Sequence, residues 1–243
     1  MSSIQRRARR AGIVYFVMSV LGAPMLLFLP RFVVAGDPTA TAHNIAAGEA
    51  TYRLLLLGGL IGSILFAVLG WSLYHLFEEI DRRQATLVLC LVLVSATIGI
   101  LDVAFLAVPL VLRQSTAFLS AFSPAQLDAL ALSALRVRSF EVRADEALWG
   151  FWLVPFGILV IRSGFIPRVI GILLLIASVG YVAMSAAYIG FPSYVGAVDR
   201  VGMILIQGEL PAVLWLLIVG ARRVSPSRVA APPPANERAP AVG

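Results

Sequence analysis

Two acidic residues inside long apolar runs are the residues whose types and positions could do chemistry. Asp102 lies in the run from Thr86 to Leu112, and Glu209 lies in the run from Val201 to Ala221. A carboxylate near the middle of a bilayer costs several kcal/mol unless it is protonated, paired or hydrated. No arginine lies inside either run to act as a counter-ion. We therefore expect both carboxyls to face the bundle interior and share a polar cavity, with at least one neutral at pH 7.

The sequence around Glu209 predicts a polar break in the last apolar helix. Pro211 has no backbone N–H and disrupts the hydrogen bond to the carbonyl of Gln207, and Gly208 loosens the same turn. Interrupted helices of this kind line ion and substrate sites in transporters. Asp102, Gln207 and Glu209 are therefore the candidate intramembrane polar site. The alternative is a kinked packing helix in which Glu209 is hydrogen-bonded to a neighbour.

The sequence predicts no catalytic residue, no metal site and no cofactor. His43 and His75 are expected at opposite ends of the helices, too far apart to ligate one metal ion. Cys90 is the only cysteine, so no intramolecular disulfide can form, and we expect it to be a small buried apolar residue. HExxH, CxxC and GxSxG motifs are missing, and the absence of lysine excludes a phosphate-binding P-loop. These observations weigh against an enzyme.

The elements that must position the acids are membrane-spanning helices. The chain is 60% hydrophobic and 13% charged, with a mean hydropathy of +0.92. A spanning helix needs roughly 20 apolar residues. We therefore predict an all-α, polytopic membrane protein, with a basic cytoplasmic segment 1–11, a six-helix transmembrane domain 12–221 and a disordered cytoplasmic tail 222–243. The predicted spans are residues 12–29, 54–77, 86–112, 147–161, 169–189 and 201–221.

The long third loop carries a helix signal of its own. A capping box begins at Ser123 and precedes apolar residues at helical spacing. This pattern predicts an amphipathic helix over residues 124–138 that lies on the membrane surface. Trp149 and Trp152 follow near the outer boundary, where an aromatic belt is expected.

The distribution of arginine predicts the orientation. All 19 basic residues are arginine, and they cluster near helix ends, which disfavours nucleic-acid binding. With both termini cytoplasmic, twelve arginines lie inside and seven outside. This arrangement follows the positive-inside rule and predicts a bacterial plasma (inner) membrane protein with both ends in the cytoplasm. Gly58 and Gly62 form a GxxxG motif, which favours helix packing and is compatible with a homo-oligomer.

Several segments resemble a known family. They are GDPTATAHNIAAGEATYRL at 36–54, SPAQLDALAL at 123–132, the stretch 149–182 with SGFIPRVIG at 163–171, and GELPAVLWLLIVGAR at 208–222. Together they resemble the bacterial membrane family catalogued as domain of unknown function 4386, over about residues 10–222. The resemblance supports the helix count and implies no activity, cofactor or substrate.

Three classes of function remain open. The first is a non-catalytic structural or regulatory membrane protein, which needs no unusual site. The alternative is a small transporter or a lipid or small-molecule binder that uses the central carboxyls. A membrane-embedded enzyme is the third, and only the carboxyl pair could serve it. The expected partners are membrane lipids, a hydrophobic small molecule or a proton or cation, and a second copy of the chain, but no nucleic acid.

Overall fold

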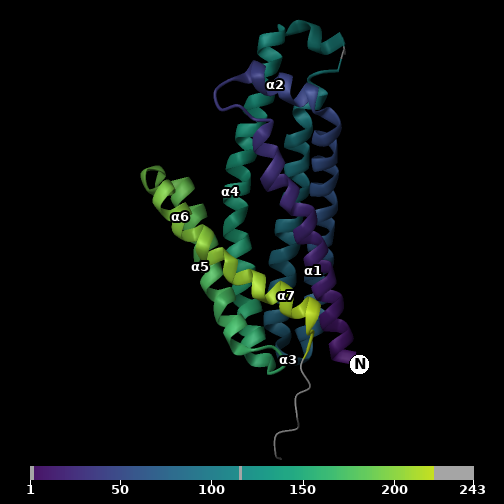
Figure 1. The fold of residues 1–243 in the computed structure, drawn as a ribbon, viewed down its shortest axis with the longest axis vertical. Coiled ribbons are helices and arrows are strands. Elements are labelled where there is room, and N and C mark those ends of the chain that lie inside the picture. Colours follow the sequence, from purple (N-terminus) through teal and green to yellow (C-terminus); the bar gives the residue numbers. More distant parts are fainter. Residues whose placement is uncertain (1–2, 115–116, 222–243) are drawn as a thin grey trace, which may run out of the picture.

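The computed structural model describes residues 3–114 and 117–221, and every regular element in these ranges is a helix (Figure 1). The predicted disordered tail, 222–243, lies outside the described residues. In chain order the elements are α1 (Ser3–Phe28), η1 (Leu29–Arg31), α2 (Pro38–Ala47), α3 (Glu49–Val111), η2 (Ala117–Ala121), α4 (Pro124–Ser163), α5 (Arg168–Gly190), η3 (Pro192–Tyr194), α6 (Val195–Leu205), η4 (Ile206–Glu209) and α7 (Leu210–Ile218).

The 63-residue element α3 is a hairpin of two helical arms. Asp81 has non-helical backbone angles, φ −155° and ψ 95°, and marks the point where the chain reverses. Small residues of the first arm face the second arm in antiparallel register. A Cβ on Gly59 would lie near Val103, and one on Gly70 would lie near Val92, so the facing pairs are centred on residue 81. The two arms therefore correspond to the second and third apolar runs.

Helix α4 is longer than the sequence predicts. It begins at the capping box, in which the Ser123 side chain accepts from the Gln126 backbone N–H, and it ends at Gly164 with φ 71°. Residues 124–138 are helical, but they continue without a break through 147–161 as one helix of 40 residues beside α3. The predicted position of 124–138 on a membrane surface remains a prediction.

The last apolar run is interrupted where the sequence predicts a break. A 3₁₀ turn, η4, separates α6 from α7, and Pro211 lies in the first turn of α7. Gly208 lies against α5, where a Cβ would be only 2.5 Å from the backbone oxygen of Leu173. The close approach of the two backbones therefore requires glycine at this position.

The apolar interior consists of two clusters with a polar layer between them. One cluster includes Leu106 on α3 and Leu135 on α4. The other, at the opposite end of the bundle, includes Val92 on α3 and Trp152 on α4. The helix segments between these clusters carry most of the buried polar side chains, namely Ser95, Asp102, Asp145 and Glu146.

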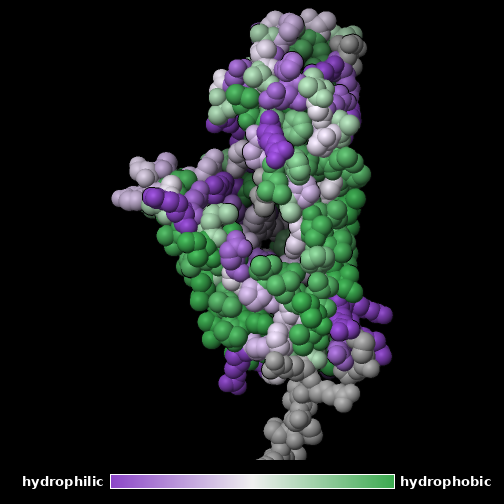
Figure 2. Space-filling view, viewed as in Figure 1, coloured by the Kyte–Doolittle hydropathy of each residue, from purple (hydrophilic) through white to green (hydrophobic). Residues whose placement is uncertain are grey.

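On the face of the bundle shown in Figure 2, apolar side chains cover much of the surface, and hydrophilic ones gather near the ends and beside α6. Within residues 3–114 and 117–221, five helical stretches are long and apolar enough to cross a membrane, and one of them is the α3 hairpin with its two arms. Cys90 is exposed, which corrects the expectation that it is buried. Trp152 is only 2% exposed and packs against Phe66 and Phe156, so its assignment to an aromatic belt is wrong.

Candidate functional site

Asp102 is paired with an arginine, contrary to the expectation that it lacks a counter-ion. Arg138 on α4 places Nε 2.7 Å from Oδ1 of Asp102 and Nη2 3.2 Å from Oδ2. The two side chains are only 14% and 12% exposed, respectively. The prediction failed because it ended the outer loop at residue 146, whereas α4 begins at Pro124 and brings Arg138 alongside α3. The cost of the buried Asp102 carboxylate is therefore offset by a two-contact ion pair.

Arg138 belongs to a polar stripe on the face of α4 that meets α3. Glu141, Asp145 and Trp149 follow it at spacings of three, four and four residues, which place them on one helix face. Asp145 Oδ2 accepts a 2.8 Å hydrogen bond from the hydroxyl of Ser95 on α3. It also accepts one of 2.8 Å from the indole N–H of Trp149. The stripe thus fills the polar layer between the two apolar clusters.

A second ion-pair group on α4 connects it to α6. Arg143 forms a two-pronged pair with Asp199, with nitrogen–oxygen distances of 3.2 and 2.8 Å. The same guanidinium lies 3.2 Å from an oxygen of Glu146 and 5.2 Å from the centre of the Tyr188 ring. One arginine therefore pairs with two carboxylates here, and it joins α6 to α4 at Asp199.

Glu209 lies between two tyrosines from different helices. It accepts hydrogen bonds from the hydroxyl of Tyr15 on α1 and from that of Tyr181 on α5, the latter at 3.0 Å. Tyr15 is 1% exposed, and its ring packs 6.1 Å from that of Trp152. A carboxyl has acceptor sites for about four hydrogen bonds. Glu209 therefore retains capacity for a further donor after both tyrosines are bound.

The three residues of the predicted site do not form one contact group. Gln207 is exposed, and its amide donates to the carbonyl of Met203 in the preceding helix α6 at 3.2 Å. Asp102 and Glu209 bind the different partners described above. An indirect connection runs through Trp149, whose indole N–H reaches Asp145 and whose ring lies 5.9 Å from that of Tyr181, the partner of Glu209.

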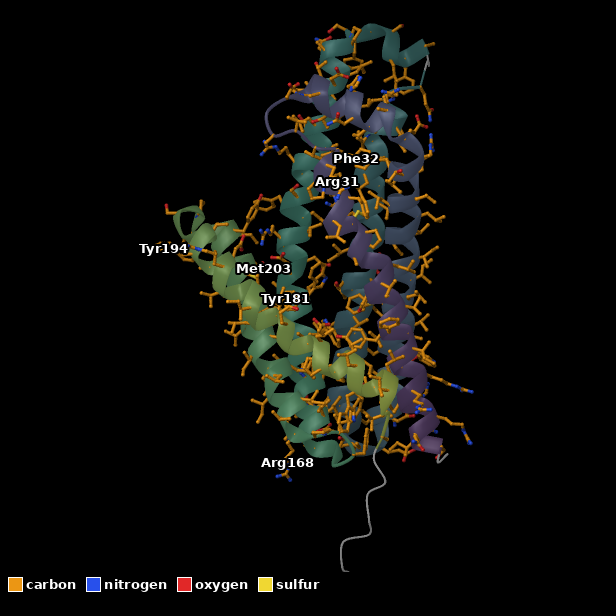
Figure 3. The ribbon with its side chains drawn as sticks, in the orientation of Figure 1. Arg31, Phe32, Arg168, Tyr181, Tyr194 and Met203 are labelled. Atoms are coloured by element: carbon orange, nitrogen blue, oxygen red, sulfur yellow. The ribbon has the colours of Figure 1, made fainter. Side chains whose placement is uncertain are left out.

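The face of the molecule beside Glu209 is hollowed. Figure 2 shows an opening between α1 and α6, above α7 in this view, and Figure 3 places Tyr181 and Met203 at this level. On α1, Ser19 and Gly22 lie four and seven residues beyond Tyr15 on the same helix face, and both are exposed. A Cβ on Gly22 would meet no atom within 4 Å. This face of α1 is therefore uncovered above the Tyr15–Glu209 contact.

Sequence reasoning missed most partners of the two acids. A signal for Arg138, Glu141 and Asp145 was present, because their spacing continues the helical pattern of the span that follows. The tyrosines carried no such signal. Tyr15 and Tyr181 are ordinary aromatic residues of apolar runs, and only the packing of α1 against α7 and of α5 against η4 brings them to Glu209.

The fold and these polar groups define a class of protein: a bundle of long apolar helices with ion pairs and hydrogen-bonded carboxyls in its interior. The family model described as a domain of unknown function (DUF4386) matches residues 10–220, and the chain belongs to this family. Neither a curated protein nor a solved structure matches the chain.

Proposed function

We propose that the chain is an integral membrane protein of six spans, with both termini on the cytoplasmic side of a bacterial inner membrane. The apolar helical stretches, with α3 counted as two arms, supply the six spans. Contacts between distant arginines and backbone carbonyls support a common end for the termini and the α3 turn. Arg7 donates to the carbonyl of His75 near that turn, and Arg9 donates to the carbonyl of Ile218 at the end of α7.

Cysteine labelling tests this topology. In a Cys90→Ala background, a membrane-impermeant maleimide should label Ser193→Cys in intact cells, because the α5–α6 turn lies outside. It should label Ser227→Cys only after the cells are opened. Labelling of Ser227→Cys from outside intact cells would refute the proposed orientation.

We further propose that the protein is a non-catalytic binder of a hydrophobic small molecule with a cationic or hydrogen-bond-donating head. The observation that carries this proposal is the hydrogen bond that Glu209 accepts from Tyr181, which lies at the level of the hollow between α1 and α6. Met203 is 53% exposed at the level of the hollow and offers contact to a hydrocarbon tail. The remaining acceptor capacity of Glu209 would bind the polar head.

The charge of Glu209 favours an amine over an alcohol or an acid. Among the described residues, its partners within hydrogen-bond distance are two tyrosine hydroxyls, which are neutral donors and bring no positive charge to the carboxyl. A cationic head would supply both a donor and the missing charge, whereas a carboxylate head would be repelled. The geometry thus predicts a preference order of amine, alcohol and acid for chains of equal length.

Thermal unfolding of the full chain in nanodiscs tests this order with dodecylamine, dodecanol and dodecanoate as probes. At a free probe concentration ten times Kd, a specific ligand stabilises the folded state by about 1.4 kcal/mol. We expect that stabilisation from dodecylamine for the wild type and for Glu79→Gln, a control because the Glu79 side chain is 81% exposed. Glu209→Gln should lose it. Equal stabilisation of Glu209→Gln and the wild type, or equal effects of all three probes, would refute the proposal.

A second candidate function is a structural or regulatory role without a ligand. The observation that favours it is the pairing of the acids, since Asp102 has Arg138 and Glu209 has two tyrosine donors. Buried polar groups that are fully paired can serve packing alone. The probe experiment separates the two candidates, because this second role predicts no difference between wild type and Glu209→Gln in response to dodecylamine.

A further inference from the structure

The polar layer between α3 and α4 contains carboxylate oxygens that no hydrogen bond satisfies. Asp145 is 5% exposed, and its Oδ2 takes the bonds from Ser95 and Trp149, whereas its Oδ1 is buried and has no hydrogen-bond partner. Oε2 of Glu141 is also buried without a hydrogen-bond partner. Oδ1 of Asp102 lacks a hydrogen bond as well, but it lies 2.7 Å from Nε of Arg138 in the ion pair. A buried acceptor without a donor is costly, so each of these atoms requires an explanation.

The charges of this layer do not balance when every carboxyl is ionised. Glu141 lies within electrostatic reach of Asp102, Asp145 and Arg138. Three carboxylates and one guanidinium leave an excess of two negative charges. Arg143 cannot supply the difference, because it is already bound to two other carboxylates on a different side of α4.

A metal ion is not the missing positive charge in this arrangement. Within residues 3–114 and 117–221, no group of three or more His, Cys, Asp or Glu has the geometry to hold one. A proton, in contrast, requires only a short path to a carboxyl oxygen and an acceptor to which the resulting hydroxyl can donate. It would turn an unsatisfied acceptor into a hydroxyl and reduce the charge excess at the same time.

We propose that Glu141 and Asp145, held beside the Asp102–Arg138 ion pair, form a proton-binding site inside the bundle. The site takes up at least one exchangeable proton at neutral pH. Asp102 already has Arg138 as its partner, so we assign the proton to Glu141 or Asp145. This site is separate from Glu209, and its existence does not depend on the ligand proposed above.

Other titratable groups face the site from each neighbouring element. The first arm of α3 contributes Tyr52, whose hydroxyl donates to the carbonyl of Leu106 at 2.8 Å and which lies within electrostatic reach of Arg138 and Asp102. Helix α4 itself contributes Glu146, which is paired with Arg143. Tyr15 of α1 and Tyr181 of α5 are bound to Glu209. Each of these groups already has a polar partner, which leaves the two unsatisfied carboxyls as the proton acceptors.

Infrared spectroscopy of the full chain in nanodiscs tests the proposal. The wild type should show a protonated-carboxyl band at pH 7 that shifts on exchange into D₂O. Glu141→Gln and Asp145→Asn should each weaken or shift this band. Arg138→Gln should strengthen it, because the loss of the guanidinium raises the charge excess by one and a further carboxyl must take a proton. If Arg138 served packing alone, its replacement would not strengthen the band.

Two controls keep the result interpretable. Glu209→Gln should leave the band assigned to the polar layer unchanged, and circular dichroism of each variant should retain the helical signal. The proposal is overturned if the wild type shows no protonated-carboxyl band at pH 7. It is also overturned if the band persists unchanged in both Glu141→Gln and Asp145→Asn, or if it disappears only in Glu209→Gln.

Discussion

Replacement of Arg138 by glutamine should destabilise the protein strongly and in a pH-dependent way. The side chain makes contacts of 2.7 and 3.2 Å with Asp102, and both partners are at least 86% buried as side chains. Removal of one member of a buried ion pair typically costs about 3–5 kcal/mol, because the other charge is left uncompensated. An exposed pair would contribute at most about 1 kcal/mol. The structure therefore predicts a loss near the buried value at neutral pH.

The pH dependence follows from a count of protons. The folded Arg138→Gln variant lowers the cost of its uncompensated carboxylate by taking up one additional proton. The carboxyls of the unfolded chain, in contrast, are ionised above about pH 5. The folded state then binds more protons than the unfolded state, so stability falls as pH rises. The slope is about 1.4 kcal/mol per pH unit for each extra proton. Between pH 6 and pH 8, the free energy of unfolding of the variant should therefore fall by about 3 kcal/mol relative to that of the wild type.

Unfolding of purified protein in mixed micelles at pH 6, 7 and 8 measures both effects. Arg136→Gln is the matched control, because Arg136 lies two residues away on the exposed side of α4, and it should stay within about 0.5 kcal/mol of the wild type. The double variant Asp102→Asn, Arg138→Gln should recover much of the loss, since neither charge remains. The reasoning is refuted if Arg138→Gln matches Arg136→Gln, or if its destabilisation does not change with pH.

Two further predictions address the last helix and the carboxyl beside the hollow. Gly208→Ala should destabilise by about 1–3 kcal/mol in thermal unfolding, because its Cβ would overlap an α5 backbone oxygen, whereas Gly62→Ala, which meets no atom within 4 Å, should not. An equal effect of the two would contradict the close approach. Tyr181→Phe removes one of the two hydrogen bonds that hold the Glu209 carboxyl in position, so it should weaken dodecylamine binding about fivefold, whereas exposed Tyr194→Phe should leave the measured affinity unchanged.

The helical class and several helix boundaries could be predicted because they depend on local sequence. Runs of apolar residues indicate helices in lipid, and the capping box at Ser123 marks the start of α4 correctly. The break near Gly208 also follows from local chemistry, since Pro211 cannot donate a hydrogen bond. These features require no knowledge of which helix packs against which.

The partners of the buried acids could not be predicted in the same way. The Asp102–Arg138 pair joins residues 36 positions apart, and the Tyr15–Glu209 contact joins residues 194 positions apart. Such pairs depend on helix register and packing, which hydropathy does not encode. The arginine count assigned Arg138 to an outer loop, whereas Arg138 lies on α4 and pairs with Asp102 of α3.

The polar layer offers a reason why α3 and α4 adopt one register. Two apolar helices with similar surfaces can shift by one turn relative to each other at little cost in lipid, because their apolar contacts before and after the shift are alike. Two polar contacts prevent this slip here. Ser95 meets Asp145, and Asp102 meets Arg138, in the same antiparallel alignment. A shift of one turn would break both contacts at once and leave charged and hydroxyl groups buried without partners, a penalty that the observed register avoids.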